Sequence, residues 1–214
     1  MFFAIEGVIG VGKTTLARLL QPSFESNLLL EVFEENPFLT NFYQDRARYA
    51  FQTQIFFLLS RYYQQNRSVP ELLANGKHLI SDYTFDKDSL FARINLSGDE
   101  LEMYYRVHTA LAEKIPAPDL VVYLRASTDV LMQRIAMRDR SYERAMQRDY
   151  IEMLNQAYES FYSQPEWVEK TLVIDTNTLD YVSDPSALEW VDTRIRQALQ
   201  LPPFQPELPM ADKK

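Results

Sequence analysis

The sequence predicts an α/β protein in which a five-stranded parallel sheet lies between two layers of helices. Short apolar runs alternate with longer amphipathic stretches along the chain, which is typical of strands that alternate with helices. A glycine-rich segment also follows the first apolar run directly, and parallel sheets bind ligands at the carboxyl ends of their strands. The 214 residues suit one such domain with a sizeable core.

Each element is expected where the hydrophobic period changes. Residues 2–6 form an apolar run typical of a buried strand, and 14–20 form the helix after it. Further strands are expected at 28–32, 77–81, 120–124 and 171–174. Further helices are expected at 41–67, 99–114, 127–139 with Ser127 as N-cap, from 143 or 144 to about 161, and at 185–199. We predict one domain over residues 1–200 and a proline-rich tail over 201–214.

The glycine-rich segment after the first strand carries the most specific signal. Its residues, Gly7-Val8-Ile9-Gly10-Val11-Gly12-Lys13-Thr14, match the pattern G-x-x-x-x-G-K-[ST]. Glycines let backbone N–H groups surround a phosphate, and the following helix adds positive potential. Lys13 is expected to reach the β- and γ-phosphates of ATP, and the Thr14 hydroxyl to bind Mg²⁺. This loop, with Thr15, predicts a nucleoside triphosphate site and a P-loop NTPase fold.

A cluster of arginines predicts a lid at about residues 134–145. Arg134 and Arg138 are four residues apart and share a helix face, and Arg140 follows at the helix end. The favoured interpretation is a mobile segment that closes these cations over a transferring phosphoryl group, with Arg138 as a catalytic residue. The alternative is a solvated basic helix end stabilised by the helix dipole.

Two carboxylates are expected at strand ends that face the phosphate loop. Glu31 lies at the end of the second predicted strand and Asp82 at the end of the third. One of them is suited to accept the proton of an acceptor hydroxyl, and the other to hold Mg²⁺ or its waters. The sequence does not choose between them for the role of general base. The alternative is a pair of solvent-facing strand-end carboxylates.

Bulk composition excludes several function classes. The net charge of −8 argues against polymeric nucleic acid as a ligand. The chain has no Cys, which excludes disulfides, thiol catalysis and zinc–thiolate sites. No apolar run reaches the length of a membrane span, and the first residues lack the basic region of a signal peptide. We therefore expect a cytoplasmic protein with no membrane partner.

Several further segments resemble those of the deoxyribonucleoside kinase family. They are Glu-Glu-Asn-Pro-Phe-Leu-x-x-Phe-Tyr at 34–43, Phe-Gln-x-Gln…Leu-Leu-Ser-Arg at 51–61, Asp82, and Arg-x-Arg-x-x-Glu at 138–143. Together with the phosphate loop they are similar to the bacterial deoxyguanosine/deoxyadenosine kinases over residues 1 to about 180. The resemblance implies ATP- and Mg²⁺-dependent phosphorylation of the 5′-hydroxyl of a deoxyribonucleoside in nucleotide salvage, by a homodimer.

The same resemblance implies roles for individual residues. Glu31 would contact the 5′-hydroxyl, and Asp82 would lie near Mg²⁺ and that hydroxyl, each being a candidate general base. Tyr43 and Glu143 would hold the sugar 3′-hydroxyl, and Gln54 would hydrogen-bond the base. Arg61 and Asp88 would form a charged pair at the far end of the base pocket, where their polarity favours guanine, adenine and cytosine over thymine. Similarity to the bacterial purine enzymes then favours deoxyguanosine or deoxyadenosine, and the alternative is a structural salt bridge that does not touch the base. The aromatic residues near Gln54, namely Tyr49, Phe51, Phe57 and Tyr62, are expected to be core.

One departure from the family pattern concerns the residue after Asp82. The family commonly has Arg there, whereas this chain has Tyr83, and Lys87 or Arg93 are candidates to restore the positive charge. Two alternative functions stay open at this point. One is a nucleoside-monophosphate kinase of the thymidylate type, whose Asp-Arg-Tyr motif and Gly-Gly turn are absent here. The other is a nucleotide-binding regulator without an acceptor.

Overall fold

The chain folds around one five-stranded parallel sheet, as predicted. A computed structural model describes residues 1–32, 35–74 and 76–204. The strands are β1 (Phe2–Glu6), β2 (Ser26–Leu29), β3 (His78–Ser81), β4 (Leu120–Arg125) and β5 (Thr171–Asp175). Their order in the sheet is β2-β3-β1-β4-β5, and all neighbouring pairs are parallel. Since β1 is central, the loop after it lies between the exits of β3 and β4.

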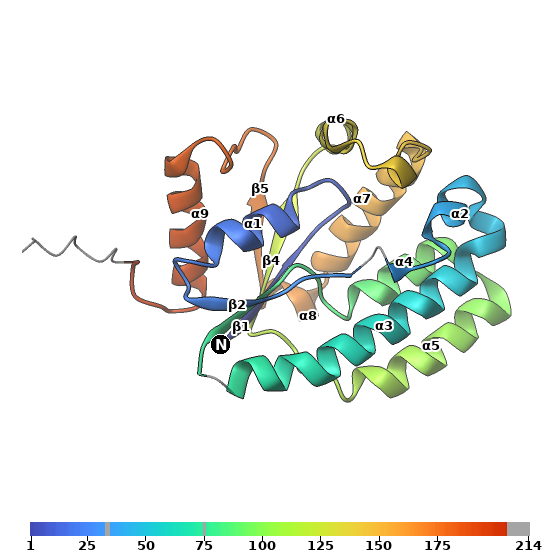
Figure 1. Cartoon of the computed structure of the whole chain (residues 1–214), viewed down its shortest axis with the longest axis horizontal. Helices are drawn as coiled ribbons and strands as arrows, with labels where there is room; N and C mark the ends of the chain where they lie inside the picture. Colours follow the sequence, from blue (N-terminus) through green and yellow to red (C-terminus); the bar gives the residue numbers. More distant parts are fainter. Residues whose placement is uncertain (33–34, 75, 205–214) are drawn as a thin grey trace, which may run out of the picture.

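Helices cover both faces of this sheet. The elements are α1 (Lys13–Leu20), α2 (Leu39–Gln44), α3 (Arg46–Ala74), α4 (Lys87–Asn95), α5 (Gly98–Ala112), α6 (Thr128–Arg138), the short 3-10 helix η2 (Ser141–Glu143), α7 (Arg148–Tyr162), α8 (Pro165–Val168) and α9 (Pro185–Ala198). Figure 1 shows α1 and α9 on one side of the sheet and α3, α4, α5 and α7 on the other. The three-layer architecture is therefore confirmed.

The central strand supplies apolar side chains to both layers. Phe2 and Ala4 pack in a cluster with Val69 of α3, whereas the ring of Phe3 lies 5.1 Å from that of Phe24, which follows α1. Successive side chains of a strand point to opposite faces, so a strand covered on both faces is apolar throughout. All five residues of β1 are buried, including the carboxylate of Glu6.

The predicted helix at 41–67 is in fact two helices, α2 and α3. They meet at Asp45, whose non-helical backbone (φ −144°, ψ 82°) interrupts the helix and whose carboxylate accepts a hydrogen bond from the Arg48 N–H. Such side-chain capping satisfies an N–H that a new helix leaves unpaired. Helix α3 also continues past the predicted end, through Pro70 to Ala74. Burial of Val69 beneath the sheet fixes this last part in place.

Other predicted boundaries also shift. The second strand ends at Leu29 rather than 32, because its partner β3 ends at Ser81 and offers no further ladder. Helix α7 begins at Arg148, later than predicted, and α4 and α8 were not predicted. Helix α6 matches its prediction, since the Ser127 hydroxyl accepts from the Val130 N–H.

The end of the chain was predicted to be a separate tail. Residues 201–204 have no regular secondary structure, and Arg196 of α9 donates to the carbonyl oxygen of Pro202 at 3.2 Å. The rest of the predicted tail, 205–214, lies outside the described residues. Within the described part of the chain, no helix has the length and apolar character that a membrane span requires.

Candidate active site

The phosphate loop follows β1 and leads into α1, as predicted. Gly7 has φ +143°, and a Cβ atom there would lie 2.4 Å from the carbonyl oxygen of Leu124, so the neighbouring strand leaves room for glycine alone. The Lys13 ammonium donates to the carbonyl oxygens of Gly7 at 2.7 Å and Val8 at 3.2 Å. Burial, followed by the charge of Lys87, lowers the pKa of Lys13 to about 8. A ligand with negative charge would therefore be strongly favoured beside this ammonium.

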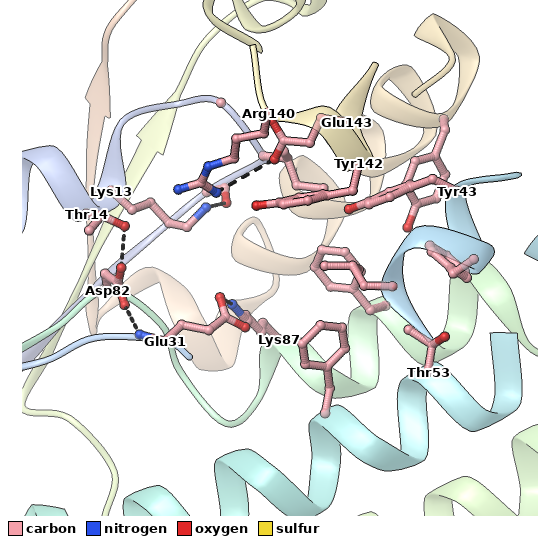
Figure 2. Close-up of a pocket in the computed structure, with 18 of the residues that line it drawn as sticks. Lys13, Thr14, Glu31, Tyr43, Thr53, Asp82, Lys87, Arg140, Tyr142 and Glu143 are labelled. Atoms are coloured by element: carbon pink, nitrogen blue, oxygen red, sulfur yellow. Dashed lines mark hydrogen bonds and ion pairs between the residues drawn. The ribbon is translucent and has the colours of Figure 1, made fainter. Parts of the chain in front are cut away.

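Asp82 links the phosphate loop to the chain after β2. Its carboxylate accepts hydrogen bonds from the Thr14 hydroxyl and, at 2.8 Å, from the backbone N–H of Glu31 (Figure 2). Thr14 and Asp82 therefore place two hard oxygen ligands at the mouth of the loop, which is the donor chemistry that Mg²⁺ prefers. Because Mg²⁺ usually takes its other ligands from phosphates and water, these residues fit the predicted metal site.

Glu31 lies two residues beyond the end of β2 and is held by two cations. Arg61 donates to its Oε1 atom, with the Nε atom at 2.9 Å, and Lys87 donates to Oε2 at 2.7 Å. Burial alone would raise the pKa of Glu31, but the charges and hydrogen bonds of Arg61 and Lys87 hold this pKa far below its ordinary value. Glu31 is therefore an ionised carboxylate with a fixed orientation.

A second buried carboxylate, Glu6, fastens the loop to the elements around it. Its Oε1 atom accepts from the Thr84 N–H at 2.6 Å and the Thr84 hydroxyl at 3.1 Å. Its Oε2 atom accepts from the Gly7 N–H and the Tyr158 hydroxyl, both at 3.1 Å. Glu6 thus joins the start of the phosphate loop, the loop after β3 and helix α7. This role was not predicted, because a single Glu within an apolar run gives no signal of its partners.

The predicted lid arginines differ in what they contact. Arg138 makes a bidentate ion pair with Glu143, with a closest distance of 2.5 Å, and Arg140 lies 3.8 Å from the same carboxylate. Arg134 instead donates to the carbonyl oxygens of Val11 at 3.2 Å and Thr176 at 2.6 Å. Arg134 therefore fastens the phosphate loop to the residue after β5. Contact of these arginines with phosphate, and lid motion over 134–145, stay predictions.

The largest group of predicted site residues surrounds one cavity between the phosphate loop, α2, α3 and η2. It encloses about 860 Å³ of space between protein atoms, its open mouth included. Figure 2 shows Tyr43, Tyr142 and Glu143 above it and Glu31, Lys87 and Thr53 below. Its lining is Gly7, Ile9, Gly10, Lys13, Thr14, Glu31, Leu39, Phe42, Tyr43, Thr53, Gln54, Phe57, Arg61, Asp82, Lys87, Phe91, Arg138, Arg140, Tyr142, Glu143, Tyr150 and Tyr158.

Aromatic rings form flat walls of this cavity. The rings of Tyr43 and Tyr142 are nearly parallel, with centroids 6.4 Å apart. Burial, followed by the neighbouring Tyr150 and Glu143, raises the pKa of the Tyr43 phenol well above its ordinary value, so this phenol keeps its proton as a hydrogen-bond donor. The expectation that Phe57 is core is wrong, since it lines the cavity beneath the guanidinium of Arg61, which lies 4.5 Å from its ring centroid.

The charged pair of Arg61 and Asp88 is present, but only Arg61 lines the cavity. Asp88 is fully buried behind Arg61 and forms an ion pair with it. Arg61 therefore bridges Asp88 and Glu31, which the family resemblance did not indicate. Of the two candidates to replace the missing Arg, Lys87 lines the cavity and Arg93 is exposed. Glu34 of the motif at 34–43 lies outside the described residues.

A second cavity adjoins the other side of the phosphate loop. Its lining is Gly10, Val11, Gly12, Thr15, Val130, Gln133, Arg134, Met137, Arg138, Asn177, Thr178, Leu179, Asp180, Tyr181, Val182 and Ser183. The segment 177–183 gave no sequence signal because it has neither a motif nor a period. The loop and Arg138 border both cavities, so a ligand in each would meet at the phosphate loop.

These features define a P-loop protein with separate cavities on the two sides of its phosphate loop. A parallel sheet with β1 at its centre carries the loop, and carboxylates follow β2 and β3. The sequence model of the deoxynucleoside kinase family matches residues 3–200, so the chain belongs to this family and is a phosphotransferase.

Individual relatives agree with this family. The chain is 33% identical over 201 residues to the deoxyguanosine kinase of Bacillus subtilis, covering 92% of this chain and 97% of that one. It is 30% identical over 167 residues to the deoxyadenosine/deoxycytidine kinase of the same organism, covering 74% and 75%. The structure of deoxyadenosine kinase from M. mycoides with bound dATP has a TM-score of 0.78 and 27% identity, covering 92% of this chain and 99% of that one.

Proposed function

We propose that the protein transfers the γ-phosphate of ATP, with Mg²⁺, to the 5′-hydroxyl of a purine deoxyribonucleoside. One observation supports this most directly. Lys13, Thr14 and Asp82, which suit a triphosphate and its metal, line the same cavity as Glu31 and a set of aromatic walls. A nucleoside in this cavity would therefore have its hydroxyl beside the phosphate loop, which is the proximity that phosphoryl transfer requires.

The contacts of the two carboxylates favour a division of their roles. Asp82 is hydrogen-bonded to Thr14, the proposed metal ligand, whereas Glu31 is hydrogen-bonded to Arg61 and Lys87 on the side of the cavity. We assign Asp82 to the Mg²⁺ side and Glu31 to the acceptor hydroxyl. A bound Mg²⁺ would neutralise charge on the β- and γ-phosphates. Because phosphoryl transfer proceeds through a loose transition state, Glu31 serves mainly to orient the hydroxyl and receives its proton late.

The sugar and the base would lie farther from the phosphate loop. Tyr43 and Glu143 line the cavity and are proposed to hold the 3′-hydroxyl, and the buried amide of Gln54 is proposed to read the base. In this structure Arg138 forms an ion pair with Glu143, and Arg140 lies 3.8 Å from the same carboxylate. Sugar binding therefore requires that Glu143 share or exchange these partners.

The purine preference is proposed from the polarity near Arg61. Its guanidinium lies over Phe57 and is paired with Asp88, so it presents donors rather than an apolar surface for a thymine methyl. The names of relatives include deoxyguanosine, deoxyadenosine and deoxyadenosine/deoxycytidine kinases. A role in nucleotide salvage and a homodimer belong to the same proposal and are carried by the family resemblance alone, whereas a cytoplasmic location is proposed from the composition of the sequence.

A substrate panel tests the proposed reaction. The purified protein is given ATP and Mg²⁺ with each of the four deoxynucleosides and their monophosphates, and ADP formation is measured. We expect deoxyguanosine and deoxyadenosine to give the highest kcat/KM, and Lys13→Ala to be folded and inactive. Turnover of monophosphates alone would support the thymidylate-type alternative, and ADP formation that is independent of any acceptor would refute a nucleoside kinase.

A double variant tests the preference for purines. Arg61→Met with Asp88→Ala removes both charges together, which avoids leaving one buried charge unpaired. Because Arg61 also holds Glu31, this variant is expected to lose activity on every substrate. The informative quantity is therefore the ratio of kcat/KM for thymidine to that for deoxyguanosine, which we expect to rise by about tenfold or more. An unchanged ratio would show that the pair does not select the base.

A further inference from the structure

Lys87, one of the two candidates for the positive charge that is missing after Asp82, is a buried lysine in the cavity. It is the first residue of α4, follows the loop after β3, and is 4% exposed. Lysine is almost never fully buried unless it is paired, because the desolvation of an ammonium is costly. Here the ammonium lies 2.7 Å from Glu31 Oε2, and both side chains line the cavity (Figure 2). The fold therefore places a lysine side chain, paired with Glu31, at the acceptor end of the site.

No other residue of the 82–93 segment supplies this charge. Tyr83, directly after Asp82, is fully buried, and its hydroxyl donates to Gln64 of α3 at 2.6 Å. Arg93 lies in the last turn of the same helix as Lys87 and is exposed. Within segment 82–93, Lys87 is therefore the cationic residue that lies in the site.

The Lys87 ammonium lies beside the Glu31 carboxylate, in the cavity that the phosphate loop also lines. The two oxygens of the Glu31 carboxylate have different partners, since Oε1 accepts a hydrogen bond from Arg61 and Oε2 accepts one from Lys87. Lys13 lines the same cavity, and the charge of Lys87 contributes, after burial, to lowering the pKa of Lys13. An ammonium has three N–H donors, and Glu31 accepts one of those of Lys87 among the described residues. Two donors are therefore available to oxygens of a ligand that enters between them.

We propose that Lys87 is a catalytic residue that contacts the transferring phosphoryl group on its acceptor side. In the reaction proposed above, on which this inference rests, the bond from the γ-phosphorus to the β,γ-bridging oxygen breaks, and its electron pair leaves with ADP. A bond forms from the 5′-oxygen to the γ-phosphorus, and the hydroxyl proton passes to Glu31. Lys87 keeps its own proton, orients Glu31 and donates hydrogen bonds to oxygens whose charge changes along this path.

The test compares neutral substitutions at Lys87 with a matched control on the same helix. Lys87→Met removes the charge at nearly constant length, Lys87→Gln retains an N–H donor for Glu31, and Lys87→Arg retains the charge. Arg93→Met removes the same charge from an exposed position of α4. For each protein kcat, the nucleoside KM and the urea midpoint are measured with the best deoxynucleoside of the panel.

We expect both neutral variants to lower kcat by about 100-fold or more, while the nucleoside KM changes by less than about fivefold, as for loss of one donor to a developing charge. Lys87→Arg should recover at least about tenfold of this loss, and Arg93→Met should stay within about twofold of the unsubstituted protein. If Lys87→Met does not fold, Lys87→Gln gives the same comparison.

Two results would overturn the inference. One is a kcat within about threefold of the unsubstituted protein in both neutral variants. The other is a loss confined to the nucleoside KM, which would make Lys87 a binding residue only. Failure of the proposed function is a different result, because the unsubstituted protein would then phosphorylate no deoxynucleoside at all.

Discussion

Replacement of Glu6 by Gln tests whether this buried carboxylate holds the phosphate loop in place. Glu6 accepts four hydrogen bonds, from the Thr84 N–H and hydroxyl, the Gly7 N–H and the Tyr158 hydroxyl. A glutamine amide has one oxygen and one NH₂ group. The two hydroxyls can reorient to accept from NH₂, but whichever way the amide lies, the backbone N–H of Gly7 or of Thr84 faces another donor.

That unsatisfied N–H determines how much free energy of unfolding the Glu6→Gln variant loses. A buried donor without a partner costs about 1–3 kcal/mol. The weaker remaining hydrogen bonds and the relief from burying a charge are opposite in sign and similar in size, so they largely offset each other. We therefore expect Glu6→Gln to lower the free energy of unfolding by about 1–3 kcal/mol, which lowers Tm by about 2–12 °C for a chain of this length.

The assay is urea and thermal unfolding followed by circular dichroism, with Tyr158→Phe as the control. That variant removes one donor and leaves the carboxylate bonded to Gly7 and Thr84, so a loss of about 1 kcal/mol or less is expected. Hydrogen exchange at the amide of Gly7 or of Thr84 should accelerate in Glu6→Gln, and both amides should stay slow in Tyr158→Phe. A Glu6→Gln protein as stable as the unsubstituted one, with both amides still protected, would refute the reasoning.

Three further predictions concern the substrates. Because the pKa of Lys13 is lowered to about 8, its ammonium loses the proton as pH rises through that value. The KM for ATP should therefore be flat below about pH 7 and should rise above about pH 8. A KM that stays constant to about pH 10 would contradict this. Arg138→Ala should lower kcat by about 100-fold with a smaller effect on the nucleoside KM, because its charge is needed as charge develops on the transferring group; an unchanged kcat would leave Arg138 only its ion pair with Glu143. A 2′,3′-dideoxynucleoside should lose about 1–3 kcal/mol of transition-state binding through the unpaired Tyr43 and Glu143; equal kcat/KM for the natural and dideoxy substrates would remove these residues from the sugar site.

The parts predicted well from sequence are those whose signal is local. The strands carry continuous apolar runs because both faces are covered, and the phosphate loop has fixed glycine spacing. The positions of Glu31 and Asp82 were predicted because residues just beyond the carboxyl ends of parallel strands gather at one edge of the sheet. The structure places both of them beside Thr14 and Lys13.

The parts predicted poorly are those in which charged or polar side chains are buried. Helix α4 was missed because Lys87 and Asp88 lie on its buried side, which removes the apolar period that indicates a helix. Arg134 and Arg138 share a helix face, but spacing does not tell what each side chain contacts. Arg134 donates to the carbonyl oxygen of Thr176 after β5, whereas Arg138 forms an ion pair with Glu143.

The two cavities beside the phosphate loop draw on different stretches of the chain. Among the described residues, none between Thr15 and Val130 lines the second cavity, whereas the first takes Glu31 to Phe91 from that interval. Mutations within 31–91 are therefore free to alter one cavity and leave the walls of the other intact. This separation gives protein engineers a way to reshape the first cavity without changing the residues that line the second.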